Sequence, residues 1–181
     1  MSEEIDVLKL VCRKLESAGI RYMLTGSLAA NFYAAPRMTR DIDFVIEMLH
    51  PDIDRFFRIF CEDFYIDKTA ISEAIRHQGM FNVIHNSSVF KIDFIVRKDS
   101  AYRNVEFQRR YQTELDGEQI WLVSPEDLII SKLFWAKDSF SELQMRDVKN
   151  LLLSIKTLDK KYIRQWVKAL QLDAIYEKVT V

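Results

Sequence analysis

Residues 26–46 read GSLAANFYAAPRMTRDIDFVI, and this stretch decides the fold. The segment LAANFYAA predicts a helix that Pro36 ends, because proline cannot continue a helix. Residues 41–47 alternate between apolar and polar, which predicts a strand with one buried and one polar face. A further strand over residues 21–25 precedes the glycine. The stretch therefore predicts a strand, a glycine turn, a helix and a second strand.

Gly26 and Ser27 lie where the first strand passes into this helix. Glycine there lets the backbone approach a ligand closely, and a helix N-terminus offers free N–H groups that suit phosphate. The Ser27 hydroxyl adds one more donor. A Gly-Ser pair at a strand end is most often only a turn and a helix cap, so this motif needs support from elsewhere.

Acidic residues recur on two predicted strands. Asp41 and Asp43 are two residues apart, so both carboxylates point to one side of a strand and suit a hard cation. Asp93 stands in KIDFIV, a second strand of the same pattern. If the strands are neighbours, Asp93 completes a three-carboxylate cluster, which repulsion would disfavour without bound cations. The alternative is a surface carboxylate paired with Lys91.

The order of predicted elements sets the fold class. We expect a helix over 4–17, strands over 21–25 and 41–47, helices over 51–64 and 69–77, strands over 80–85 and 88–97, and a hairpin over 112–123. Ser124 then caps a helix that begins at Pro125, and the pattern stays helical to residue 181. Strands first and helices last indicate an α+β protein with a helical C-terminal half.

Together, these motifs resemble the nucleotidyltransferase superfamily that includes DNA polymerase beta. The string R-x-T-x-D-I-D is similar to that of the small branch related to the AbiEii toxins. Later segments, SPEDLIISKL and RDVKNLL, resemble the same branch. The residues that carry the resemblance are Gly26, Ser27, Arg37, Thr39, Asp41, Asp43, Asp93, Lys132, Arg146 and Asp147.

The resemblance implies the nucleotidyltransferase fold, a mixed β-sheet flanked by helices with a helical C-terminal extension. The corresponding division is a nucleotidyltransferase core over 1–123 and a C-terminal extension over 124–181 that packs on it. The implied reaction moves a nucleoside monophosphate from a nucleoside triphosphate (NTP) to an acceptor hydroxyl. The enzyme would be toxin-like, with tRNA or a protein as acceptor and an antitoxin as a further partner.

The resemblance also assigns roles to residues. Asp41, Asp43 and Asp93 would be catalytic and would hold two Mg²⁺ ions. Nucleotide binding would use Gly26 and Ser27 at the β- and γ-phosphates, Arg37 or else Arg40 against the triphosphate charge, Thr39 to orient Asp41, and also Lys132 and Asp147. Lys132 has an alternative as a lysine whose stem lies on a core helix, and Asp147 as a surface ion pair with Arg146.

Bulk composition limits the partners. The 26 basic and 27 acidic residues give a formal charge of −1, so we expect no duplex-DNA binding. No apolar stretch is long enough for a membrane span, and the N-terminus does not resemble a targeting signal. We expect a cytoplasmic protein with two buried, reduced thiols at Cys12 and Cys61.

Two groups of basic residues offer a path for an RNA acceptor, although such runs are usually solvated faces. The first comprises Arg97, Lys98, Arg103, Arg109 and Arg110. The second comprises Lys156, Lys160, Lys161, Arg164 and Lys168, together with Tyr162 and Trp166.

Two rival hypotheses stay open. In one, the chain is a non-catalytic nucleotide- or partner-binding module that retains the fold. In the other, it is an interaction protein with solvent-exposed acids, which predicts that the two acidic strands are not adjacent.

Overall fold

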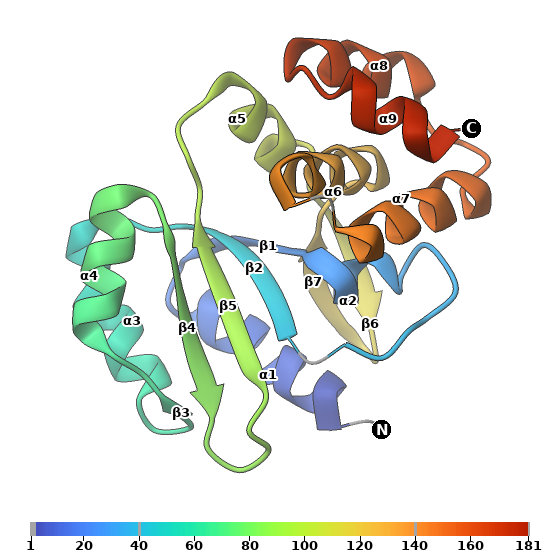
Figure 1. Cartoon of the computed structure of the whole chain (residues 1–181). Helices are drawn as coiled ribbons and strands as arrows, with labels where there is room; N and C mark the ends of the chain where they lie inside the picture. The colour runs from blue at the N-terminus through green and yellow to red at the C-terminus, as the bar shows by residue number, and fades with distance from the viewer. Residues whose placement is uncertain (1–2, 40, 140, 181) are drawn as a thin grey trace.

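The computed structural model describes residues 3–39, 41–139 and 141–180. Its centre is a seven-stranded mixed sheet with the strand order β3-β4-β5-β2-β1-β7-β6 (Figure 1). The strands are β1 (Arg21–Thr25), β2 (Asp41–Glu47), β3 (Phe64–Tyr65), β4 (Met80–His85), β5 (Lys91–Val96), β6 (Tyr111–Leu115) and β7 (Glu118–Leu122). This arrangement confirms the α+β class and the expected mixed sheet flanked by helices.

Helices lie around this sheet, with α1 behind it in Figure 1 and the C-terminal helices gathered beyond β1 and β7. They are α1 (Glu3–Ser17), α2 (Gly26–Ala30), the 3₁₀ helix η1 (His50–Asp52), α3 (Ile53–Phe60), α4 (Lys68–His77), α5 (Ala101–Gln108), α6 (Pro125–Ser139), α7 (Glu142–Ser154), α8 (Lys160–Ala169) and α9 (Asp173–Thr180). None of the helices in the described part of the chain combines the length and the apolar character needed to cross a bilayer.

Alternating side chains anchor the two acidic strands to the core. Ile42 and Phe44 of β2 are fully buried, as is Phe94 of β5. The ring of Phe94 lies 5.8 Å from that of Phe44 and 5.2 Å from that of Phe56 on α3. Burial of these aromatic faces fixes which side of each strand faces the core, so the acids between them must face the other side.

The helices after residue 124 share this core. Leu128, Ile129 and Leu133 of α6 are fully buried, and they belong to the same cluster of apolar side chains as the strands. Ser124 accepts a hydrogen bond from the Asp127 N–H, which confirms the predicted cap. The division into 1–123 and 124–181 stays a prediction.

The first predicted helix after Gly26 is shorter than the sequence indicates. Regular helix ends at Ala30, and turns follow before Pro36. The Asn31 side chain donates to the Arg37 carbonyl and accepts from the Arg37 N–H. These two bonds close a loop over residues 31–37, and such side-chain bonds compete with helix continuation.

Other predictions need correction as well. The strand predicted over 88–97 begins at Lys91, because Val89 has a φ of 60° that no strand allows. The sequence did not predict β3 or α5, although Ser100 caps α5 by accepting from the Arg103 N–H. Cys61 is exposed rather than buried, since it follows the last residue of α3, whereas Cys12 is buried as expected.

Candidate active site

The two acidic strands lie side by side. β2 and β5 pair in parallel, with Asp43 opposite Asp93 and Asp41 opposite Lys91. The Cα atoms of such partners are about 4.8 Å apart, so the three acids share one small patch of the sheet. The interaction-protein hypothesis required separated strands, and that requirement is wrong for this chain.

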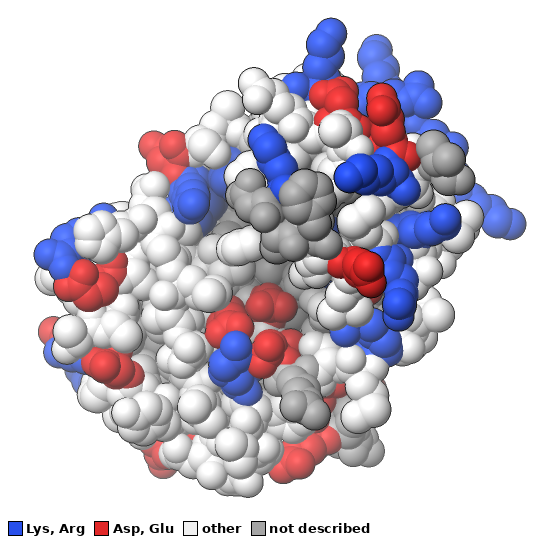
Figure 2. All heavy atoms as spheres, in the orientation of Figure 1, with Lys and Arg blue, Asp and Glu red and all other residues white. Residues whose placement is uncertain are grey.

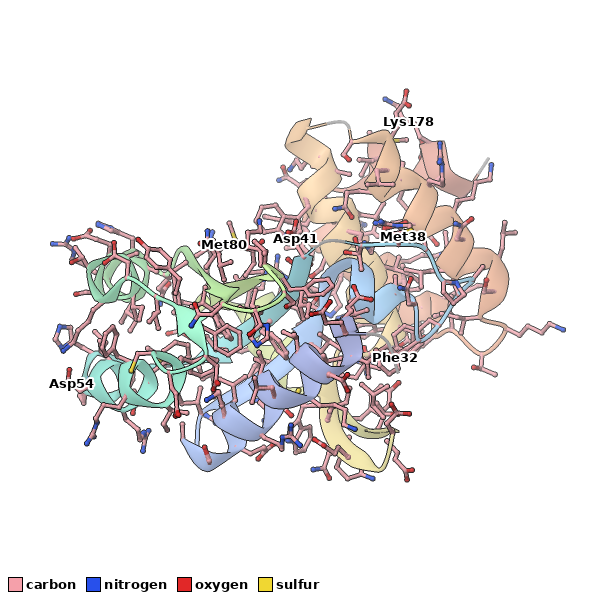
Figure 3. All side chains as sticks on the ribbon, turned by 90° about the horizontal axis from the view of Figure 1, so that it is seen from below. Phe32, Met38, Asp41, Asp54, Met80 and Lys178 are labelled. Atoms are coloured by element: carbon pink, nitrogen blue, oxygen red, sulfur yellow. The ribbon has the colours of Figure 1, made fainter. Side chains whose placement is uncertain are left out.

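The patch lies in a recess of the surface. Figure 2 shows acidic side chains gathered in a hollow between the sheet and the C-terminal helices, with a basic side chain against them. Figure 3 places Asp41 at the start of β2, with Met38 on the loop that runs toward the C-terminal helices. Loop, sheet and helices therefore all border the acids.

Burial and mutual repulsion govern these carboxylates. Asp93 is 6% exposed, and its buried Oδ1 has no hydrogen-bond partner among the described residues. Burial, and then the charges of Asp93 and Asp41, raise the pKa of Asp43 to about 6. The cluster of three carboxylates therefore carries negative charge that the neighbouring side chains only partly neutralise.

One cation already lies in the cluster. The Lys91 ammonium is 2.9 Å from Asp93 Oδ2 and 3.5 Å from Asp41 Oδ1. The hydrogen bond to Asp93 raises the pKa of Lys91, although partial burial opposes this effect. The sequence indicated this pair only as the alternative to a metal-binding Asp93, and the structure shows that the pair and the cluster coexist.

Gly26 has a specific structural reason to be glycine. Its φ is +70°, and a Cβ atom at this position would stand 1.9 Å from Asp43 Oδ2. The Ser27 backbone N–H donates a hydrogen bond to the Asp43 carboxylate, which lowers the pKa of that acid against the larger effect of burial. The loop thus packs directly on a carboxylate, a contact that the sequence alone did not indicate.

Arg37, Lys132 and Asp147 form an ion network in which Lys132 and Asp147 are buried and Arg37 is partly exposed. Arg37 donates from Nε and Nη2 to the two Asp147 oxygens, both at 3.0 Å, and from Nη2 to Ser27 Oγ at 2.6 Å. Lys132 Nζ donates to Asp147 Oδ2 at 2.8 Å and to Gln144 at 3.0 Å. A chain of contacts therefore runs from α6 and α7 to the turn at Ser27.

Burial removes the simpler alternatives for Lys132 and Asp147. They are 3% and 4% exposed, so neither lies at the surface, whereas Arg146 is exposed. Burial raises the pKa of Asp147, and Arg37 and Lys132 lower it, with a net shift downward. Gln144, which the sequence did not indicate, completes this network through an ordinary amide that carries no recognisable signal.

Thr39 and Arg40 precede the first acid. Thr39 Oγ1 donates to the backbone carbonyl of Asp41 at 3.1 Å, so it orients the strand entry rather than the carboxylate. Arg40, the alternative to Arg37, lies outside the described residues.

The donor set suits a hard cation, although it is not yet arranged as a binding site. No group of three or more His, Cys, Asp or Glu in the described ranges is already positioned to hold a metal ion. The Lys91 ammonium instead contacts both Asp41 and Asp93. The unpartnered Asp93 oxygen and the mutual repulsion at Asp43 match the carboxylate ligands that Mg²⁺ prefers.

Three arginines of the first basic group indicated for RNA are engaged within the protein, whereas Lys98 is exposed. Arg97 pairs with Glu47 at 2.6 Å, and Arg109 pairs with Asp127 at 2.9 Å. Arg103 pairs with Glu106 at 2.7 Å. These side chains stabilise the fold, so they are poor candidates for an acceptor path.

The aromatic residues of the second basic group also face inward. The Tyr162 hydroxyl donates to Asp127 Oδ1 at 2.6 Å, and the Trp166 ring lies 5.0 Å from that of Tyr102. The basic residues of this group are exposed. The surface of α8 thus offers charge without free aromatic rings.

Two small pockets border the described surface. One of about 310 Å³ is lined by His50, Asp54 and Lys68 among others, and Figure 3 places Asp54 at one edge of the molecule, well away from Asp41. The other, of about 40 Å³, is lined by Arg37 and Asp147 among others. Only the second adjoins the candidate site.

Comparisons with known proteins agree with this geometry. A model of the family described as nucleotidyl transferase AbiEii toxin, type IV toxin–antitoxin system, matches residues 10–148. That range contains Asp41, Asp43 and Asp93 as well as the Lys132–Asp147 pair. No protein with a curated description matches the sequence significantly.

Solved structures share the fold at low sequence identity. An antigenic nucleotidyltransferase-like protein from Paracoccidioides brasiliensis is 18% identical with a TM-score of 0.57, covering 98% of this chain and 94% of its own. The antibiotic-resistance factor ANT(2'')-Ia is 12% identical at 0.59, covering 97% and 95%. The lincomycin-bound lincosamide adenylyltransferase LnuA is 16% identical at 0.55, covering 83% and 96%. These likenesses support the fold.

Proposed function

The chain belongs to the AbiEii nucleotidyl transferase toxin family, and from this premise we propose that it transfers a nucleoside monophosphate from an NTP to an acceptor hydroxyl on RNA or protein. The observation that carries the proposal is the register of β2 and β5. It puts Asp43 opposite Asp93, with Asp41 on the same side, and one buried oxygen of Asp93 has no hydrogen-bond partner in the described part of the chain.

Asp41, Asp43 and Asp93 would hold the Mg²⁺ ions, two of them in the proposed enzyme. When bound, such ions stabilise negative charge on the attacking and leaving oxygens of a phosphoryl transfer. Asp93 would lie nearest the acceptor, where its free Oδ1 can accept the proton of the acceptor hydroxyl.

The turn at Gly26 and Ser27 and the Arg37 guanidinium would contact the triphosphate. Asp147 holds two edges of this guanidinium, and Lys132 neutralises the same carboxylate. We therefore assign Asp147 as a positioning residue rather than a direct nucleotide ligand, because a free carboxylate there would repel a triphosphate. Thr39 would fix the entry to β2 through the Asp41 carbonyl.

Family membership also motivates the proposed biological setting. The activity would be toxin-like, with tRNA or a protein as acceptor and an antitoxin as its antagonist. Because it consumes NTP, we propose a cytoplasmic location. The alternative function is a non-catalytic nucleotide- or partner-binding module that retains the fold.

The test incubates the protein with Mg²⁺, each α-labelled NTP in turn, and total RNA and protein. We expect label in one macromolecular class, and about a 10³-fold loss of transfer with Asp43→Asn, since charge stabilisation by a metal site is worth several kcal/mol. Asp54→Asn is the matched control, because Asp54 is exposed and lies far from Asp41 (Figure 3).

Each outcome separates the hypotheses. An NTP-dependent rise in melting temperature without any label transfer would support the binding-module alternative. Unchanged transfer by Asp43→Asn, with the variant folded, would refute the assigned site.

A further inference from the structure

Lys91 occupies an unusual place for a lysine. Residues 91 and 93 share one face of β5, and the register sets Lys91 opposite Asp41. Its ammonium therefore reaches the acids of both strands, 2.9 Å from Asp93 Oδ2 and 3.5 Å from Asp41 Oδ1. Lys91 thus contacts carboxylate oxygens that are also candidate ligands for a cation.

The charge of Lys132 also acts on Asp43 and lowers the pKa of that acid. Unlike Lys91, however, Lys132 is bonded to residues outside the acid cluster. It is 3% exposed and bonded to Asp147 and Gln144, so it has no room to leave. The Lys91 side chain is 39% exposed, and among the described residues it forms ion pairs with these two acids alone. Lys91 can therefore swing into solvent without unmaking any other ion pair that the structure describes.

We propose that Lys91 is a resident counter-ion of the Asp41–Asp43–Asp93 cluster, which a divalent cation displaces when it binds. This inference rests on the proposed function in that it takes these carboxylates as the cation ligands. In the absence of a divalent cation, Lys91 stabilises the fold by offsetting repulsion among the acids. Cation binding releases its ammonium to the mouth of the hollow.

The charge balance explains why such a residue is useful. Three carboxylates on adjacent strands repel one another in the metal-free protein, and one ammonium reduces their net charge from three negative units to two. The remaining charge still attracts a divalent cation, which competes with Lys91 for the same oxygens. Lys91 thus makes the metal-free fold more stable and weakens the apparent affinity for the metal.

The test follows thermal unfolding of the full chain in EDTA and across a Mg²⁺ titration, without nucleotide. We compare wild type with Lys91→Met, and with Lys98→Met as the matched control. Lys98 is exposed and seven residues further along the chain, roughly 20 Å away at strand spacing. The control removes the same charge without touching the acids.

We expect Lys91→Met to melt below wild type in EDTA and to bind Mg²⁺ about fivefold more tightly, a change of about 1 kcal/mol. Lys91→Arg, which retains the charge, should stay close to wild type, and so should Lys98→Met. Lys91→Met would contradict the inference if its Mg²⁺ response equalled that of wild type while wild type itself bound the ion. That result would leave the proposed function standing.

A measurement on wild type avoids reliance on a variant that fails to fold. In protein with isotope-labelled lysines, the Lys91 side-chain resonances should move toward those of free lysine as Mg²⁺ is added, and those of Lys132 should not. Lys91 resonances that stay fixed at saturating Mg²⁺ would overturn the inference alone. A protein in which neither resonances nor melting temperature respond to Mg²⁺ would overturn both the inference and the proposed metal-dependent reaction.

Discussion

The molecule buries acidic groups in two regions, and it treats them in opposite ways. Between α5, α6 and α8, Glu106 and Asp127 are almost wholly buried, and each of their carboxylate oxygens accepts a hydrogen bond. At the first residues of β2 and β5, one oxygen of Asp93 has no partner among residues 3–39, 41–139 and 141–180, and Asp43 faces two other acids. The carboxylates of the first region find all their hydrogen-bond partners within the protein, whereas those of the second lack partners among these residues for part of their charge.

The partners make the difference. Arg103 and Ser131 oppose the effect of burial on the pKa of Glu106, whereas like charges reinforce it at Asp43. The Glu106 and Asp127 region shows that this fold can supply hydrogen-bond donors to every oxygen of a buried carboxylate. The incomplete cluster is therefore better explained by an external ligand than by poor packing.

The largest expected effect on stability comes from Asp127→Asn. Asp127 accepts from Arg109, Ser124 and Tyr162. Asparagine keeps only one acceptor oxygen, so the change removes the buried negative charge beside Arg109 and leaves at least one of these donors without an acceptor. We expect the free energy of unfolding to fall by about 3 kcal/mol, as when one member of a buried pair is removed. Chemical denaturation at pH 7.5 measures this change.

The same substitution in the other region, Asp43→Asn, sharpens the comparison. It removes a buried like charge, so in EDTA it should leave stability unchanged or raise it. Equal losses from both variants would show that the strand cluster is as structural as the helical network.

Two glycines allow the cost of a left-handed backbone to be separated from the effect of contact with Asp43. Gly26 and Gly19 have nearly the same positive φ, +70° and +61°, but only Gly26 lies against Asp43. Alanine at either position should cost about 1 kcal/mol through the left-handed backbone. Gly26→Ala should in addition displace Asp43 and abolish most of the transfer.

Melting temperature and label transfer, measured on both glycine variants, decide the matter. If Gly19→Ala lost as much transfer as Gly26→Ala, the contact between loop and carboxylate would have no part in the reaction. If Gly26→Ala kept full transfer, the site would tolerate movement of Asp43.

The smallest expected effect tests how complete the helical network is. Burial is the largest influence on the pKa of Glu106 and raises it. An acid with a raised folded-state pKa contributes stability that is present at low pH and lost as pH rises through that pKa. The stability of wild type relative to Glu106→Gln should therefore fall between pH 4 and 7.

Denaturation curves at a series of pH values supply this measurement, with the exposed Glu114→Gln as a control for charge alone. A relative stability that rises with pH would mean that Arg103 and Ser131 outweigh burial. The protein would then stabilise the charged carboxylate of Glu106 even more fully, in contrast to that of Asp43.

The sequence predicted local parts of the site well and its long-range contacts poorly. The bounds of β2 follow from a strict alternation, and the shared side of Asp41 and Asp43 follows from strand geometry. The approach of Arg37 to Asp147 spans 110 residues and depends on how α7 packs against α2. No local pattern encodes such a contact.

The position of Lys91 could be predicted only in part from the sequence. Its spacing from Asp93 places both on one face of a strand, so their pairing was predictable, but its contact with Asp41 needed the register of β2 and β5. The early end of α2 likewise depends on a side chain, Asn31, that bonds to a backbone six residues away. Propensity scales do not weigh such bonds.

The ion network that joins Arg37 to Asp147 also has a consequence during synthesis. The ribosome produces Asp43 early, but the residues that hold Arg37 in place follow about a hundred positions later. At typical elongation rates of about 5–20 residues per second, roughly 5–20 seconds separate the two events. A nascent chain therefore carries its acids well before it carries the groups that orient the guanidinium, and the complete site can assemble only after Asp147 has been synthesised.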